Sequence, residues 1–360
     1  MNSVVLQQKH TAVALIALFA LVAALVGCRP PQSATPGEPQ AGSAAPAKSA
    51  VTLNVGYFPN VTHAPAVLGF SAGEQTFAKA LSGQAEVQTK IFNAGPTAME
   101  ALHAKAIDLS FVGPTPAINA HARGGDVVLV ANVANGGSVL VARKDSGIKT
   151  LKDLEGKRVA VPQLGNTQDA LLRHLLRQAK VKLSDQGGKT QVLPVENPDI
   201  MGLFMRKQLD AACVPEPWGS RLEVEAGATV VLDWKALWRN GNYPVTVLVA
   251  RREFLQQHAE VVGAFVTALK GITDRVAAQP EAEATALNAE LGKLTGKSLQ
   301  PQVINKALKR IQFTTTISPD GLQAMAEVMK EIGYAKTVPD LSQFIDGRFL
   351  PGAKPEQPRP

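Results

Sequence analysis

The run IDLSFVGPTP at residues 107–116 joins a short apolar strand to a helix start. Residues 107–112 are rich in Ile, Leu, Phe and Val, which is typical of a buried strand, and Gly113-Pro114 ends it. Thr115 is expected to cap the following helix, and Pro116 suits its first position, where a missing N–H removes no hydrogen bond. The run therefore predicts one βα unit.

Units of the same kind are predicted on both sides of this run. Strands are expected at residues 51–56, 84–92, 107–112 and 127–133. Between them lie segments with helical spacing, for example Met99, Leu102 and Ala106. Alternating strands and helices favour an α/β protein with parallel or mixed sheets flanked by helices.

A second βα series is predicted between residues 158 and 232. One of its helices carries four leucines on one face, at positions 171, 172, 175 and 176. The expected strands are 158–161, 191–195, 209–214 and 229–232, and the expected helices are 167–179 and 199–208.

Two similar runs bracket this second series, SVLVAR at 138–143 and TVLVAR at 246–251. Both are predicted to be extended, and two such crossings between lobes would form a double hinge. The alternative is that short Val-rich strands resemble one another by chance. After Arg252, helices are expected at 259–278, 281–294, 301–311 and 321–333, packed onto the first lobe.

Composition limits the classes of function. The chain has 360 residues, of which 45% are hydrophobic and 19% charged, which indicates a globular protein with a core. Its formal net charge is +7, but the basic residues are scattered among acids. Because nucleic-acid binding requires a basic stripe, no nucleic-acid partner is expected. A mild positive bias suits an anionic ligand.

The N-terminus resembles an export signal. Lys9 and His10 precede an apolar run at 12–26, and the run ends in Leu-Val-Gly-Cys28, which is similar to a bacterial lipobox. Residues 1–27 are therefore predicted to be a lipoprotein signal peptide, with Cys28 taking a lipid that anchors the protein to a bacterial membrane. An uncleaved membrane anchor is the alternative, although the run is short for a bilayer span.

Two flanking segments are predicted to lack a core. Residues 28–50 are rich in Pro, Ala, Ser and Gly and are expected to be a flexible tether, spanning on the order of 25 Å. Residues 351–360 are expected to be a disordered tail. If Cys28 carries lipid, Cys213 has no disulfide partner, and it is interpreted as a small buried hydrophobe. No His/Cys cluster has zinc-ligand spacing.

The βα junctions suggest an anion site. The segments 60–65, 94–97, 113–116 and 165–168 each follow a strand and start a helix with Gly, Pro, Thr or Asn. Helix starts leave free N–H groups and carry partial positive charge, so several that converge can hold an anion without a dedicated cation. A single junction is more simply explained by ordinary capping, but four in two lobes favour a shared site.

Three other features are candidates for the same cleft. The run VPEPW at 214–218 places Trp218 where it could either line a cleft or pack between domains. Its neighbour Glu216 is interpreted as a capping or hinge residue. Asn135 and Ser138 flank a Gly-Gly turn, and His63 lies in a strand-to-helix loop.

At these runs the chain resembles the periplasmic solute-binding proteins of ABC transporters, in the nitrate, sulfonate and taurine group. The matching segments are GYFP at 56–59, THAP at 62–65, FNAGP at 92–96, DLSFVGPTP at 108–116, LKDLEGK at 151–157, PQLGNTQD at 162–169 and PEPW at 215–218. The resemblance implies two α/β lobes of the type II fold, joined by two crossing strands. The implied lobes are 51–141 with 248–350, and 142–247.

The resemblance also implies function and partners. The expected solute is a small organic oxyanion, most simply an aliphatic sulfonate or taurine, delivered to ABC permease and ATPase subunits. The protein is expected to be a lipid-anchored monomer of the periplasm or cell surface, without cofactor, metal or enzymatic activity. The expected ligand-binding residues are Asn60, His63, Gly95, Pro96, Thr97, Thr115, Asn135, Ser138, Gly165, Asn166, Thr167, Gln168 and Trp218.

Other functions remain open at this point. The ligand could be nitrate, bicarbonate or a thiamine-precursor pyrimidine, although stacking a pyrimidine would require more aromatic residues than the 5% present. A thiamine-pathway enzyme on the same scaffold is a further alternative. It would require a nucleophile with a base, a metal or a cofactor lysine, and the sequence shows no phosphate loop, nucleophile elbow or paired carboxylates.

Overall fold

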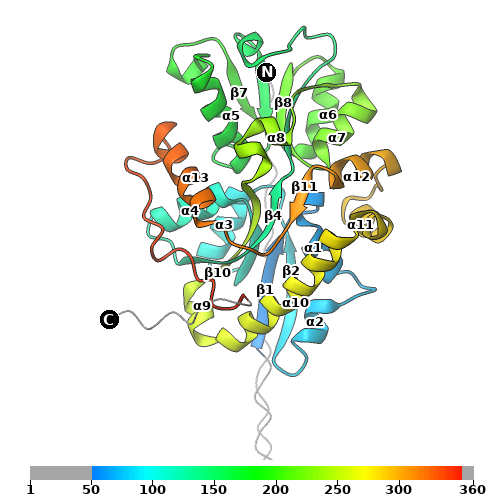
Figure 1. Cartoon of the computed structure of the whole chain (residues 1–360), viewed down its shortest axis with the longest axis vertical. Helices are drawn as coiled ribbons and strands as arrows, with labels where there is room; N and C mark the ends of the chain where they lie inside the picture. The colour runs from blue at the N-terminus through cyan, green and yellow to red at the C-terminus, as the bar shows by residue number, and fades with distance from the viewer. Residues whose placement is uncertain (1–50, 351–360) are drawn as a thin grey trace, which may run out of the picture. The chain divides into compact units, whose positions relative to one another are not determined.

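The computed structural model describes residues 51–350. The predicted signal peptide 1–27, the lipidated Cys28, the tether 28–50 and the tail 351–360 lie outside the described residues. Within them the chain forms two mixed sheets flanked by helices (Figure 1), which confirms the predicted fold class. Each sheet, together with the helices packed on it, is called a lobe below.

The first sheet has six strands in the order β11-β4-β10-β3-β1-β2. β1 pairs in parallel with β2 and β3, whereas β10 runs antiparallel to β3 and β4. Its strands are β1 (Val51–Tyr57), β2 (Ala85–Ile91), β3 (Leu109–Val112), β4 (Val127–Gly136), β10 (Pro244–Arg251) and β11 (Ile311–Phe313).

The second sheet has five strands in the order β7-β6-β8-β5-β9. β6 is parallel to β7 and β8, and β5 is antiparallel to β8 and β9. Its strands are β5 (Ser138–Ala142), β6 (Arg158–Val161), β7 (Gln191–Pro194), β8 (Ala211–Pro215) and β9 (Thr229–Leu232).

Helices connect the strands and cover both sheets. Those before β10 are η1 (Val61–His63), α1 (Ala64–Gly69), α2 (Thr76–Ala80), α3 (Gly95–His103), α4 (Pro114–Ala122), η2 (Leu151–Leu154), α5 (Thr167–Gln178), η3 (Ser184–Gln186), α6 (Asn197–Met205), α7 (Trp218–Ala226), α8 (Trp234–Leu237) and η4 (Arg239–Gly241). Those after it are α9 (Arg252–Gln257), α10 (Ala259–Ala278), α11 (Pro280–Thr295), α12 (Pro301–Leu308) and α13 (Pro319–Glu331).

Alternation along β5 shows how the second sheet is buried on both faces. Val139 and Val141 belong to the core beneath α6 and α7, whereas Leu140 and Ala142 belong to the core beneath α5. Successive side chains of a strand point to opposite faces, so a fully apolar strand needs a helix layer on each side. Figure 1 shows these layers, with α5 on one side of the sheet and α6 and α7 on the other.

One apolar core joins the two lobes. Val127 and Leu129 of β4 belong to the same cluster of buried side chains as Val159 and Val161 of β6. The lobes are therefore held together by burial of apolar surface as well as by the chain that crosses between them.

Several sequence predictions differ from the structure at element ends. The helix expected at 301–311 stops at Leu308, because residues 311–313 instead pair with β4 as strand β11. The N-cap expected at Thr115 lies two residues earlier, at Gly113. Pro114, and not Pro116, is the first residue of the helix. Of the C-terminal helices, α10 packs on α1 and α2, but α12 also contacts α7 and α13 contacts α5. The last two therefore reach both lobes.

The chain passes from the first sheet to the second between Gly136 and Ser138. The two similar runs at 138–143 and 246–251 are both extended, but they are not equivalent, since the first forms β5 of the second sheet and the second lies in β10 of the first. The lobe bounds expected from the resemblance stay a proposal.

Both glycines at the crossing, Gly136 and Gly137, have positive φ values of 73° and 65°, where side chains are disfavoured.

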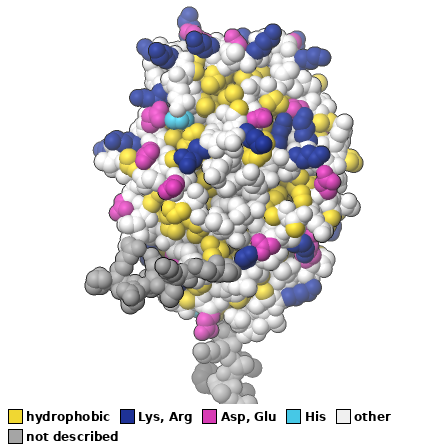
Figure 2. Space-filling model, in the orientation of Figure 1, with side chains coloured by type: hydrophobic (Ala, Val, Ile, Leu, Met, Phe, Trp, Pro, Cys, Tyr) yellow, Lys and Arg dark blue, Asp and Glu magenta, His cyan; other side chains and the backbone are white. Residues whose placement is uncertain are grey.

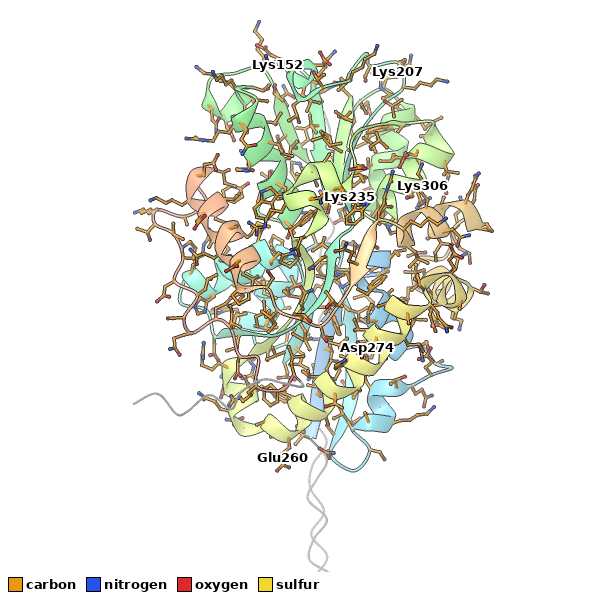
Figure 3. The ribbon with its side chains drawn as sticks, in the orientation of Figure 1. Lys152, Lys207, Lys235, Glu260, Asp274 and Lys306 are labelled. Atoms are coloured by element: carbon orange, nitrogen blue, oxygen red, sulfur yellow. The ribbon has the colours of Figure 1, made fainter. Side chains whose placement is uncertain are left out.

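Charges are mixed over the face seen in Figure 2. Lys and Arg side chains are interspersed with Asp and Glu over the elements of both sheets, and no continuous basic stripe is visible on this face. Lys152 and Lys207 lie at the end of the second lobe far from Glu260 (Figure 3). Among residues 51–350, no helix combines the length and hydropathy required to cross a bilayer.

We predict that Gly136→Ala destabilises the protein strongly. A Cβ there would lie 2.5 Å from Trp234 Cε3 and 3.1 Å from the Arg310 carbonyl oxygen, in addition to the strain of φ +73°. Overpacking and left-handed strain together should lower the free energy of unfolding by about 2–4 kcal/mol, measured by urea denaturation. The control is Gly147→Ala, at φ +74° with nothing within 4 Å, which should lose only about 1 kcal/mol. Equal losses would contradict the role of close packing at the crossing.

Candidate functional site

A small cavity lies between the lobes, where strands end and helices begin. The first lobe lines it with η1 and the starts of α3 and α4, and the second lobe with the starts of α5 and α6. The first N–H groups of a helix have no intrahelical partner and carry partial positive charge. Four α-helix starts around one space form an environment suited to negative charge.

Three buried polar side chains line the cavity without a hydrogen-bond partner. The unpaired atoms are His63 Nδ1, Thr167 Oγ1 and Asn197 Oδ1. The Thr hydroxyl is a donor, and the Asn amide becomes one on rotation of its side chain. Burying an unpaired polar atom costs about 1–3 kcal/mol, so these three atoms are available to hydrogen-bond a ligand or water in the cavity.

The cavity wall is electrically neutral. No Asp, Glu, Lys or Arg is among its lining residues within 51–350. His63 lies flat against Phe58, with ring centroids 4.5 Å apart, and burial lowers its pKa to about 3. The imidazole is therefore uncharged at neutral pH, and the donors facing the cavity are neutral hydroxyl, amide and backbone groups.

The space is narrow. Its volume is about 30 Å³, enough for roughly two water molecules. A compact group with several oxygen atoms fits such a space, but a drug-sized molecule does not.

Side-chain hydrogen bonds between the lobes close the rim of the cavity. The indole Nε1 of Trp218 donates to Asn60 Oδ1 at 2.8 Å, and Asn93 Nδ2 donates to Glu196 Oε2 at 2.8 Å. Gly113 permits a close approach between the lobes, since a Cβ on it would lie 2.3 Å from Thr167 Oγ1. The structure therefore shows the lobes closed on each other.

Six of the thirteen residues predicted for the site line the cavity. They are Asn60, His63, Gly95, Asn166, Thr167 and Gln168. They come from three separate strand-to-helix junctions in two lobes, which the fold brings to one space.

The second-lobe residues among them are fixed by the start of α5. Asn166 is the N-cap, and its Oδ1 accepts from the Asp169 N–H at 2.8 Å. Gln168 is oriented by Ser138, whose hydroxyl accepts from Gln168 Nε2 at 2.8 Å. Ser138, itself predicted as a ligand residue, thus lies behind the cavity and positions Gln168.

Gly165 and Asn135 are held by other partners, and neither lines the cavity. The Gly165 N–H donates to Asp169 Oδ2 at 2.7 Å. The Asn135 side chain accepts from Asn132 Nδ2 at 3.0 Å and lies in the β4 ladder.

The other four predicted residues lie around the cavity without lining it. At the rim, the Thr97 hydroxyl accepts a hydrogen bond from Gln163 Nε2 at 3.4 Å. Thr115 is fully buried, and Pro96 faces a separate hollow behind α3 and α4. Trp218 lines a neighbouring chamber.

Some lining residues were not predicted, among them Thr62, Asn93, Gly113 and Asn197. Asn197 carries a recognisable signal, since the pair Asn197-Pro198 after a strand has the same form as the other junctions, and α6 begins there and not at 199. The contribution of Gly113 depends on its contact with Thr167, a residue far away in the sequence.

Glu216 has the structural role that the sequence suggested. It is fully buried, its Oε2 accepts from the Ser220 N–H near the start of α7, and its Oε1 lies 2.8 Å from Arg310 Nη1. This ion pair links the junction between β8 and α7 of the second lobe to the segment before β11 of the first. Cys213 is fully buried, and burial raises the pKa of its thiol.

No group of three or more His, Cys, Asp or Glu side chains within 51–350 is arranged to hold a metal ion.

Residues 46–290 match the profile of a protein family described as the NMT1-like family. Relatives include a putative binding protein of Brucella abortus, 26% identical over 72% of this chain and 80% of the relative. A putative aliphatic sulfonates-binding protein of Escherichia coli is 33% identical over 49% of this chain and 51% of the relative. The taurine-binding periplasmic protein of Escherichia coli is 27% identical over 77% and 87%.

Solved structures show the same fold. The alkanesulfonate-binding protein of Xanthomonas axonopodis pv. citri, bound to MOPS, superposes with a TM-score of 0.68 at 21% identity, covering 84% of this chain and all of that one. The periplasmic nitrate-binding protein of Synechocystis PCC 6803 superposes with a TM-score of 0.69 at 14% identity, covering 83% and 87%.

We predict that His63 makes the ligand-free protein sensitive to acid. Its pKa is about 3 when folded and 6.5 when exposed, so the unfolded state binds the proton more tightly and stability falls as pH drops below 6.5. Linkage gives a loss of about 2 kcal/mol between pH 7 and pH 5. Urea denaturation at both pH values should show this loss in the wild type and not in His63→Gln. If the His63 imidazole, assigned by its loss in His63→Gln, titrated near 6.5 in NMR spectra of the folded protein, the prediction would be contradicted.

Proposed function

The chain belongs to the NMT1-like family and is an ABC-type periplasmic solute-binding protein of the nitrate, sulfonate and taurine group. Within that group, we propose that it captures a small organic oxyanion. The proposed ligand is an aliphatic sulfonate or taurine, held in the interlobe cavity and delivered to a permease with its ATPase. The relatives named above are binding proteins, which supports a role in binding and not in catalysis.

One observation carries this proposal, namely the three unpaired polar atoms of His63, Thr167 and Asn197 around a neutral cavity ringed by helix starts. A sulfonate keeps its single negative charge at physiological pH and accepts hydrogen bonds through three oxygens. Hydrogen bonds from neutral donors to a charged acceptor are stronger than neutral pairs. Such a cavity therefore holds a monovalent oxyanion without burying a lysine or arginine.

The two-lobed arrangement supports capture by closure. The donors come from both lobes, so an anion between them makes all of its hydrogen bonds only when the lobes are together. The bonds of Trp218 to Asn60 and of Asn93 to Glu196 also join the lobes. Anion binding should therefore favour the closed arrangement, in which a partner recognises both lobes at once.

Nitrate is the second candidate ligand. It is also a monovalent anion with three oxygens, and a nitrate-binding protein shares the fold. Bicarbonate has similar oxygens. A thiamine-precursor pyrimidine fits less well, because Phe58 and the His63 ring are the only aromatic groups among the described residues that line the cavity, and they stack on each other.

The cellular setting is part of the same proposal. Residues 1–27 would direct export, and Cys28 would carry the lipid that anchors the protein in the periplasm or at the cell surface. The segment 28–50 would tether the binding lobes above the membrane. The one cavity between the lobes would bind one anion per chain, and the proposed form of the protein is a monomer.

We predict that Thr167→Ala weakens methanesulfonate binding about tenfold, the loss of roughly one hydrogen bond to a charged acceptor. Isothermal titration calorimetry with methanesulfonate, nitrate, bicarbonate and a pyrimidine would rank the candidate ligands at the same time. Thr267→Ala is the matched control, since Thr267 is exposed on α10. A Kd unchanged by Thr167→Ala would remove this hydroxyl from the site, and tight binding of the pyrimidine alone would overturn the proposed ligand class.

A further inference from the structure

A buried carboxylate follows the cavity-lining residues of α5, although the cavity itself is neutral. Asp169 is fully buried and comes directly after Thr167 and Gln168 in the first turn of the helix. A negative charge there opposes an anion at the same helix start unless it is compensated, and a buried charge requires hydrogen-bond partners of its own. The partners of Asp169 therefore affect anion binding even where they do not reach the ligand.

Three donors satisfy this carboxylate. Asp169 Oδ2 accepts from the Gly165 N–H at 2.7 Å and from the Tyr334 hydroxyl. Asp169 Oδ1 accepts from Arg173 Nε at 2.8 Å. In return, the Asp169 N–H donates to Asn166 Oδ1 at 2.8 Å. The turn of Gly165 and Asn166, which leads into α5, is therefore held by Asp169 through two hydrogen bonds.

Tyr334 belongs to a segment that is fixed to the first lobe at both of its ends. Residues 314–346, called the C-terminal strap below, follow β11 and contain α13. The two ends of the strap hydrogen-bond to the backbone of β4, through Thr314 with Val133 and Asp346 with Leu129. Between these ends, α13 contacts α4 of the first lobe and α5 of the second (Figure 1). Tyr334 therefore reaches from the first lobe to the start of α5.

The Tyr334 side chain is arranged to donate to Asp169. Burial, and then the negative charge of Asp169, raise the pKa of the Tyr334 hydroxyl, so it keeps its proton at neutral pH. The Arg173 guanidinium lies over the Tyr334 ring, with its carbon 5.7 Å from the ring centroid, which is within the range of a cation–π contact. The two side-chain donors of Asp169 therefore also contact each other.

A second polar link between the strap and α5 does not involve Asp169. Glu331, at the end of α13, places its Oε2 at 2.9 Å from His174 Nδ1 and its Oε1 at 3.4 Å from Arg177 Nε. Both partners lie further along α5 than Asp169, away from the start of the helix. This link separates two roles of the strap, namely holding α5 as a whole and positioning its first turn.

We propose that Tyr334 is a positioning residue for anion binding, acting through Asp169 on the turn that leads into α5. Without the Tyr334 hydroxyl, the carboxylate would compete more strongly with the anion for the N–H groups of this turn, and its charge would be less compensated beside the site. The geometry of the second lobe's part of the site then depends on a donor from the first lobe. This inference rests on the proposed function and adds a control on the same site.

Calorimetry with methanesulfonate on the full chain tests this role. Tyr334→Phe removes the hydroxyl and keeps the ring against Arg173, so the variant is expected to fold. It should weaken binding about fivefold, less than the loss expected for a group that contacts the anion itself. Glu331→Gln breaks the second link between the strap and α5, and it should leave the Kd unchanged. Equal losses in the two variants would overturn the action of Tyr334 through Asp169.

A second pair of variants reaches Asp169 from its other oxygen. Arg173→Gln removes the cation that pairs with Asp169 and should also weaken methanesulfonate binding. Arg177→Gln removes an equal charge one turn further along α5, where it pairs with Glu331, and should not weaken binding. A Kd unchanged by Arg173→Gln, or lowered affinity of the same size in Arg177→Gln, would contradict the proposal even if Tyr334→Phe were too unstable to purify.

Double-mutant cycles provide a readout that a merely structural role of Tyr334 would not change. Because Thr167 lies on the turn that Tyr334 is proposed to position, the losses of affinity in Tyr334→Phe and Thr167→Ala should be less than additive when combined. Asn197 lies at the start of a different helix, α6, so the losses in Tyr334→Phe and Asn197→Ala should add. Additive losses in both cycles would contradict the positioning of the α5 turn.

The outcomes separate this inference from the function on which it rests. If the wild type bound methanesulfonate and Tyr334→Phe bound it equally well, the positioning role would be overturned and the oxyanion site would stand. If the wild type bound neither methanesulfonate nor nitrate, the proposed function would be overturned and this inference with it.

Discussion

The structure depends on one electrostatic constraint, the meeting of helix starts from two lobes at a buried, uncharged space. Backbone N–H groups at these starts have no partner within their helices. Around them, Thr167, His63 and Asn197 hold polar atoms that the protein itself leaves unpaired. These atoms come from both lobes, and the proposed anion between the lobes would complete the hydrogen bonding of both.

The scaffold explains how the helix starts reach one place. Parallel neighbours such as β1 with β3, and β6 with β8, end at the same edge of their sheets, so the helices that follow begin there together. The close crossing at Gly136 and Gly137 sets the two edges against each other. Gly113 then lets Thr167 approach the opposite lobe closely, and the Glu216–Arg310 pair joins the lobes beside the crossing, where the Glu216 N–H donates to the Gly137 carbonyl oxygen.

Local sequence predicted the elements well and the contacts between them poorly. The leucines of α5 and the alternation in β1 are local signals, and both elements formed where expected. By contrast, β11 is only three residues long, and it is a strand because β4 offers it a partner. For the site, junction motifs predicted Thr167 and Gly95, which line the cavity. Local motifs also predicted Gly165 and Asn135, whose polar groups are instead occupied by near neighbours in the sequence, Asp169 and Asn132.

The most direct test is a crystal structure of the protein with methanesulfonate, which has a head and almost no tail. The sulfonate oxygens should lie within hydrogen-bond distance of the Thr167 hydroxyl and of backbone amides at the starts of helices from both lobes. A sulfonate bound elsewhere, or contacts from one lobe only with the cavity left empty, would contradict the convergence of helix starts as the basis of recognition.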